Sequence, residues 1–83
     1  MSNLLGKSQI VCLLALLDEP RSVNQILVWC QNNIDRTDAM YASVDSIRGA
    51  VRRLEDRYFV RRVGDKPTKW ELTASGRQAA RNV

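Results

Sequence analysis

The stretch Ser46–Arg62, "SIRGAVRRLEDRYFVRR", decides how the chain is interpreted, because it combines six arginines with a regular apolar stripe. Ile47, Val51 and Leu54 recur at helical spacing, and Tyr58 continues the series. This periodicity predicts a helix with one buried face. The arginines on its other face either keep the helix solvated or meet an anion outside the protein.

The predicted helix begins at Ser43, which can accept a backbone hydrogen bond as an N-cap. With the apolar stripe turned inward, the outward face and its flanks carry Asp45, Ser46, Arg48, Gly49, Arg52, Arg53 and Asp56. A glycine in mid-helix costs about 0.5–1 kcal/mol relative to alanine, so Gly49 should bring a benefit. Two benefits are open: close packing against the preceding helix, and close approach of the backbone to DNA.

A β-hairpin is predicted directly after this helix. The runs 59–63 and 69–73 flank "GDKPT", whose Gly64, Asp65 and Pro67 favour a turn. Trp70 and Leu72 alternate with polar residues, which is the period of a half-buried strand. The hairpin tip is basic. A short last helix should begin at Thr73 or Ser75, with Gly76 as a weak point.

Two further helices are predicted before residue 43. Gly6–Asp18 is apolar nearly all round, so a second surface must cover it, either the C-terminal segment or another subunit. Ser22 can cap the next helix, whose apolar stripe continues towards Ile34, while Trp29 points away from that stripe. Residues 32–42 form a polar linker. The predicted order is three helices, a hairpin and a last helix.

The length of 83 residues predicts one domain, 1–83, with a modest core. Residues 1–43 carry three basic and four acidic side chains, whereas residues 44–83 carry ten and five. This asymmetry suggests a polyanion partner, but on composition alone a generally basic surface explains it equally well. No apolar run is long enough to cross a bilayer, and no signal peptide is evident. Cys12 and Cys30 are expected to be buried free thiols in a reducing cytoplasm.

Enzymatic activity is not expected. The chain has no histidine, which removes Ser-His and Cys-His nucleophile arrangements and histidine metal ligands. Neither cysteine has a neighbouring metal ligand in the sequence, and there is no glycine-rich phosphate loop. We therefore predict no catalytic residue, no metal and no cofactor.

The stretch Ser46–Arg62 and the later "KWELTASGRQAA" resemble the winged helix-turn-helix regulators of the MarR/PadR type. Leu72, Thr73 and Gly76 match the Leu-Thr-x-x-Gly start of that family's last helix. The resemblance spans residues 22 to 80 and implies a three-helix core, a β wing and a short C-terminal helix. It further implies a recognition helix in the major groove, a wing on the DNA backbone and a homodimer. Tyr58 departs from the glycine that usually ends the recognition helix.

The function predicted from these features is sequence-specific binding of double-stranded DNA by a small transcriptional repressor, cytoplasmic and associated with the nucleoid. The alternatives are a winged-helix module that binds protein, and a non-specific nucleic-acid-binding component of a larger complex. The predicted DNA-binding residues are Ser43, Asp45, Ser46, Arg48, Gly49, Arg52 and Arg53 in the helix, and Arg61, Arg62, Lys66, Thr68 and Lys69 in the wing. A homodimer interface is predicted at Cys12, Ala15, Leu16 and Trp29.

Overall fold

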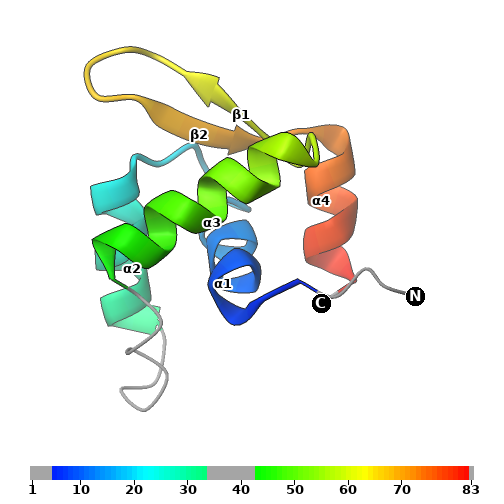
Figure 1. The fold of residues 1–83 in the computed structure, drawn as a ribbon, viewed down its shortest axis with the longest axis horizontal. Coiled ribbons are helices and arrows are strands. Elements are labelled where there is room, and N and C mark those ends of the chain that lie inside the picture. Colours follow the sequence, from blue (N-terminus) through cyan, green and yellow to red (C-terminus); the bar gives the residue numbers. More distant parts are fainter. Residues whose placement is uncertain (1–4, 34–42, 83) are drawn as a thin grey trace.

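The computed structural model of the protein describes residues 5–33 and 43–82. The elements in chain order are α1 (Lys7–Ala15), α2 (Val23–Asn33), α3 (Val44–Asp56), β1 (Val60–Val63), β2 (Lys69–Leu72) and α4 (Ala74–Arg81) (Figure 1). This order confirms the predicted one, a mainly α domain with a small β-hairpin. α1 ends at Ala15, earlier than the predicted Asp18. The predicted linker begins inside α2, and its remainder, with Ile34, lies outside the described residues.

Polar side chains start three of the helices, as the sequence predicts. Ser22 and Gln25 form a reciprocal capping box: the serine Oγ accepts the Gln25 N–H at 3.2 Å, and the glutamine Oε1 accepts the Ser22 N–H at 2.9 Å. Ser43 Oγ accepts the N–H of Ser46 at 3.1 Å at the start of α3. Thr73 Oγ1 accepts the N–H of Gly76 at 3.1 Å at the start of α4.

The end of α3 differs from the prediction that Tyr58 extends the buried stripe. The helix stops at Asp56, and Tyr58 adopts a left-handed φ of 64° with 80% of its surface exposed. Its N–H donates to the Glu55 carbonyl at 2.9 Å, and the Phe59 N–H donates to the Leu54 carbonyl at 2.9 Å. These two bonds form a Schellman motif, which turns the chain sharply into β1. The tyrosine therefore occupies the position where a glycine is usual.

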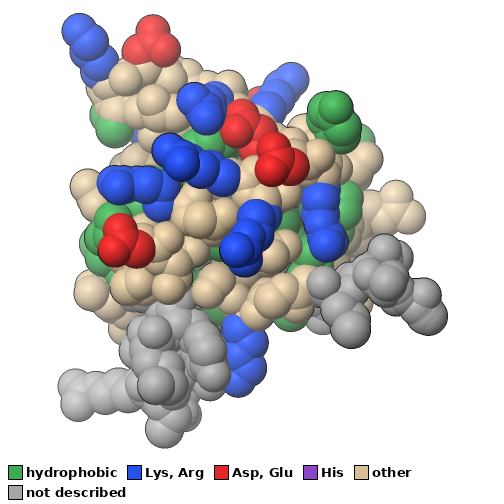
Figure 2. All heavy atoms as spheres, viewed as in Figure 1, with side chains coloured by type: hydrophobic (Ala, Val, Ile, Leu, Met, Phe, Trp, Pro, Cys, Tyr) green, Lys and Arg blue, Asp and Glu red, His purple; other side chains and the backbone are tan. Residues whose placement is uncertain are grey.

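α3 crosses the face of the molecule that is turned to the viewer in Figure 1, with the β1–β2 hairpin beside it. Lys and Arg side chains gather over these elements on that face, with fewer Asp and Glu side chains among them (Figure 2). The recognition helix and the wing of the predicted fold therefore share one side of the molecule.

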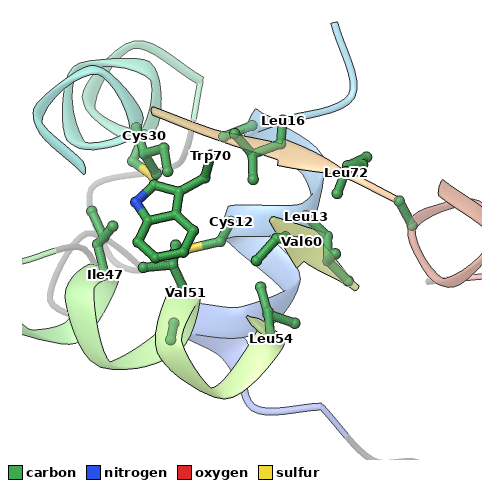
Figure 3. Packing of buried hydrophobic residues seen from close by; sticks show 14 residues of the cluster. Cys12, Leu13, Leu16, Cys30, Ile47, Val51, Leu54, Val60, Trp70 and Leu72 are labelled. Atoms are coloured by element: carbon green, nitrogen blue, oxygen red, sulfur yellow. The ribbon is translucent and has the colours of Figure 1, made fainter. Parts of the chain in front are cut away.

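The core lies around α1, which packs against α2, α3 and α4. Residues from the helices and both strands meet there, among them Leu13, Val51, Leu54 and Trp70 (Figure 3). This arrangement corrects one prediction. Cys12, Ala15 and Leu16 are 0%, 0% and 2% exposed, because the chain itself covers this side of α1, whereas Ile10, Val11 and Leu14 are half-buried. The three predicted residues therefore belong to the core and offer no surface for a homodimer interface.

The wing is a two-stranded antiparallel sheet in which Val60 pairs with Leu72 and Val63 with Lys69. Arg21, in the connection between α1 and α2, adds a bridge to β2. Its N–H donates to the Trp70 carbonyl at 3.1 Å, and the Trp70 N–H donates to the Arg21 carbonyl at 2.8 Å. The base of the wing is thereby fixed to the helical core.

Both cysteines are free and buried, as predicted. Burial, together with the smaller effect of the nearby Cys30 thiol, raises the pKa of the Cys12 thiol to about 12. Burial also raises the pKa of Cys30. Both thiols are therefore neutral near pH 7 and serve as small apolar side chains.

Candidate nucleic-acid interface

Three arginines of α3 are exposed and unpaired. Within residues 5–33 and 43–82, Arg48, Arg52 and Arg53 form no ion pair, although α3 itself carries carboxylates. The helix buries Ile47, Val51 and the rest of its apolar stripe against the core, which turns these guanidinium groups outward. The face therefore presents positive charge that no described carboxylate neutralises.

The predicted α3 residues divide between two flanks of the helix. On one flank, Arg48 and Arg52 line a shallow hollow together with the start of α2 and the wing. We call this the wing hollow, and its lining residues are Ser22, Val23, Asn24, Arg48, Arg52, Arg62, Pro67, Thr68 and Trp70. On the other flank, Ser46, Gly49 and Arg53 line a second hollow with Asp45 and the start of α1.

Gly49 lies on the outward side of α3 in open space. A Cβ built at this position meets no atom within 4 Å. Close packing against α2, one of the two explanations for a glycine here, is therefore excluded. The missing side chain leaves the backbone of α3 accessible to an approaching ligand at this point.

Two of the predicted α3 residues have structural roles. The Ser43 hydroxyl donates to Ser46 Oγ at 2.9 Å and accepts the Ser46 N–H, so it caps the helix. Asp45 is exposed in the first turn, where its negative charge stabilises the helix dipole and would repel a phosphate. Among the predicted DNA-binding residues of α3, only the three arginines therefore carry positive charge.

The wing arginines are engaged within the protein. Arg61 pairs with Glu71 on the neighbouring strand. Arg62 donates from Nε and Nη2 to the two Glu55 carboxylate oxygens at 3.1 and 3.3 Å, and its guanidinium lies 5.0 Å from the centre of the Trp70 ring. Both predicted residues are exposed, but their charges are partly neutralised.

The basic tip of the wing carries the rest of its predicted residues. Lys66 is exposed, Lys69 and Thr68 are half-buried, and neither lysine forms an ion pair within the part of the chain that the structure describes. The two lysines are therefore the positive charges of the wing that have no ion-pair partner among the described residues.

Trp29, predicted at a dimer interface, is half-buried and packs against the edge of the core from α2. Its neighbour Val28 is 53% exposed, and both line a shallow hollow with Arg21. This hollow shares Asn24 with the wing hollow but contains none of the basic residues predicted to bind DNA, so the structure does not bring Trp29 together with them.

Arg21 is the residue whose role the sequence did not reveal. Its Nε donates to the Ala15 carbonyl at 2.6 Å at the end of α1, and its Nη1 lies 3.6 Å from Glu19 Oε2. Its backbone carries the bridge to Trp70. No strand pattern surrounds Arg21, so only the three-dimensional contact identifies it as part of the wing's support.

Among the described residues there is no group of three or more His, Cys, Asp or Glu side chains that could hold a metal ion. None of the described helices is long and apolar enough to span a bilayer.

The fold is similar to that of a solved structure, a single-residue mutant of Lactococcus lactis ZitR. The TM-score is 0.75 and the sequence identity is 14%, over 99% of this chain and 52% of the ZitR chain. The chain thus spans about half the length of that protein. No protein-family model matches the sequence, and no curated protein matches it. The likeness confirms the winged-helix fold, whereas function has to be argued from the site.

Proposed function

We propose that the chain binds double-stranded DNA in a sequence-specific manner and regulates transcription, in the way of MarR/PadR-type regulators. The observation that carries this proposal is the exposed face of α3, which holds three arginines without internal partners, two of them beside the basic wing. A helix fits the major groove of B-DNA, which is about 12 Å wide. The wing would then lie over the flanking backbone.

The two parts of this face have different tasks in the proposal. Arginine can donate two parallel hydrogen bonds to guanine O6 and N7, which distinguishes one base pair from another. Arg53 lies beside the open backbone at Gly49, where α3 can approach base edges closely. Lys66 and Lys69 at the wing would meet phosphates, which supply affinity and salt dependence without sequence information.

We further propose that two copies bind one pseudo-palindromic site, with half-sites about one helical turn apart. Repression by occupying a promoter is the simplest mechanism for such a protein, acting in the cytoplasm on the nucleoid. The arrangement of the half-sites recovered from bound DNA tests the homodimer, because one copy alone would recover a single half-site.

Selection of bound sequences from random duplex DNA tests the proposal directly. The wild type should enrich one motif. Arg53→Gln should relax the preference at one base position, whereas Lys66→Gln should weaken all sequences alike and keep the preferred bases. Arg77→Gln, which removes an exposed charge from α4, is the matched control and should leave both affinity and preference unchanged.

A protein that enriches no motif and binds duplex only at very low salt would contradict sequence-specific recognition. Duplex affinity that hardly changes between 50 and 200 mM salt would contradict the phosphate contacts, because binding through several phosphates loses orders of magnitude over about that range. Failure to bind any duplex specifically would instead favour a protein partner.

A further inference from the structure

The wing hollow brings together guanidinium groups from two separate elements. Arg48 and Arg52 reach it from α3, and Arg62 reaches it from β1. The hollow has a cavity volume of about 320 Å3, at the small end of the range for ligand pockets. Three cations that border one small hollow repel one another, so an anion bound there would stabilise the arrangement.

Arg62 is held in place on the rim of the wing hollow. Glu55 accepts two hydrogen bonds from its Nε and Nη2, and the Trp70 ring lies beneath its guanidinium. A guanidinium has five N–H groups, so the edge that faces away from Glu55 can still donate. Glu55 thus orients Arg62 without using its full capacity, while Arg48 and Arg52 keep all of theirs.

The start of α2 supplies neutral donors to the same hollow. Ser22 is 7% exposed, and its Oγ already accepts the Gln25 N–H, which leaves the hydroxyl hydrogen to donate. Asn24 lies in the first turn of α2, whose first backbone hydrogen bond runs from the Ile26 N–H to the Ser22 carbonyl. The Asn24 N–H therefore has no acceptor within the helix and can donate to a ligand. The side chain of Thr68 closes the hollow from the wing.

We propose that the wing hollow binds one backbone phosphate of the DNA, and that Arg48 and Arg52 fix the register of the duplex instead of reading bases. This inference rests on the proposed DNA binding and refines it. Arginine and phosphate form strong, charge-assisted bonds, often two in parallel. The phosphate would join α2, α3 and the wing through one anion, and base reading would fall to the opposite flank of α3, at Arg53.

Duplexes with a single neutral methylphosphonate test this assignment. The duplex selected by the protein is prepared in a series in which each phosphate in turn is replaced, and its affinity is measured for wild type, Arg52→Gln and Arg57→Gln. Arg57 is exposed at the end of the same helix but does not line the wing hollow. Replacements at phosphates that the wing lysines contact should also weaken binding, but replacing the one phosphate in the wing hollow of each bound copy should weaken the wild type by about tenfold or more.

The decisive readout is whether the effect of replacing a phosphate depends on the arginine substitution. Arg52→Gln should be insensitive to that one replacement, while Arg57→Gln should respond as the wild type does. Arg52→Gln should also keep the wild-type order of preferred bases. If the wild type binds its duplex specifically but no replacement couples to Arg52, the phosphate site is wrong and the proposed function stands. If no duplex is bound at all, both are wrong.

Inorganic phosphate serves as the second arm, because a free phosphate has the same chemistry as the backbone. At equal ionic strength, exchanging chloride for phosphate should change the affinity of the wild type for the duplex by less than about twofold. Saturable binding of inorganic phosphate to the free protein that disappears in Arg52→Gln, while the duplex affinity stays unchanged, would assign the hollow to a free phosphate compound and overturn its assignment to DNA.

Discussion

Tyr58 has a backbone conformation that L-residues rarely adopt. Its φ of 64° places it in the left-handed region, where the side chain crowds the following carbonyl at a cost of roughly 1–2 kcal/mol. The ring gains little in return, because it is largely exposed. The Schellman bonds at the end of α3 require this conformation whatever the residue is, which explains how the wing keeps its direction without a glycine.

Tyr58→Gly should therefore stabilise the protein by about 1 kcal/mol, since glycine reaches this region at no steric cost. Urea denaturation measures the change. Arg57→Gly is the matched control, because the φ of Arg57 is −92° and glycine there only adds freedom to the unfolded chain. Equal losses of stability in the two variants would show that Tyr58 is not strained.

Gly76 and Gly49 should respond in opposite ways to alanine. A Cβ at Gly76 would lie 1.9 Å from the Phe59 carbonyl oxygen, so α4 or the Phe59 backbone must move, at a cost of about 1–3 kcal/mol. Gly49→Ala meets no atom and should gain about 1 kcal/mol from helix propensity. Thermal denaturation of both variants checks the pair. Destabilisation by Gly49→Ala would mean that α3 is packed more closely there.

The raised pKa of Cys12 makes stability depend on pH in alkaline solution. In the unfolded chain the thiol titrates near its ordinary value of 9.0, whereas the folded thiol keeps its proton to about pH 12. The contribution of the buried, neutral thiol to the free energy of unfolding is complete below pH 9 and is lost as the pH rises from 9 to 12. When the pH is raised from about 8 to about 10.5, the urea midpoint should fall less for Cys12→Ala than for the wild type. Equal falls would contradict the raised pKa.

Single residues were predictable where the chemistry is local. Ser22, Ser43 and Thr73 each act on an N–H three residues ahead, so the sequence alone indicates their capping role. Tyr58 was assigned to the buried stripe because periodicity does not show where a helix stops. Gly76 was expected to be a weak point of the last helix, whereas the Phe59 carbonyl, which belongs to another segment, requires a glycine there.

At the scale of elements, two contacts set the position of the wing. Arg21 bonds to the Trp70 backbone and ties β2 to the helices. Arg62 joins β1 to α3 through Glu55, and its register partner across the hairpin is Trp70, on whose ring it lies. Trp70 is thus fixed at its backbone by Arg21 and at its ring by Arg62. The angle between wing and recognition helix depends on these contacts.

Glu55→Gln should loosen the wing without unfolding the protein. The pair is exposed, so its loss should cost less than about 1 kcal/mol in overall stability. Amide hydrogen exchange should become faster in β1 and β2 while the α1 amides keep their protection. Glu71→Gln is the matched control, because it breaks the Arg61 pair within the hairpin and leaves the link to α3 intact. Equal effects of both variants on the wing would argue against Glu55 as the anchor.

The elements themselves were largely predictable, and their partners were not. Apolar spacing and turn residues indicated the four helices and the hairpin, because these signals lie within short windows. The charges of Arg61 and Arg62 looked available in the sequence, since cross-strand pairing with Glu71 and tertiary pairing with Glu55 leave no local pattern. Contacts between elements therefore decided which arginines face solvent without a partner.

At the scale of the whole molecule, α1 shows what sequence alone leaves open. An all-round apolar helix needs cover on every side, and the cover can come from its own chain or from another one. Here α2, α3 and α4 cover much of α1, which removes Cys12, Ala15 and Leu16 from the surface and leaves Ile10, Val11 and Leu14 half-buried. The excess of basic residues after residue 43 was visible in the sequence, and folding gathers much of it over α3 and the wing (Figure 2).

The dependence of DNA affinity on salt is the most direct test of the α3 face. We compare the wild type with Arg48→Gln/Arg52→Gln and with Arg77→Gln/Arg81→Gln, a double variant of α4 with the same net charge. The α3 double variant should weaken binding and reduce the slope of log affinity against log salt by roughly one, because the two arginines share one phosphate and each phosphate contact contributes about 0.9. The α4 double variant should keep the wild-type slope. Equal reductions in both, or no reduction in either, would contradict the account.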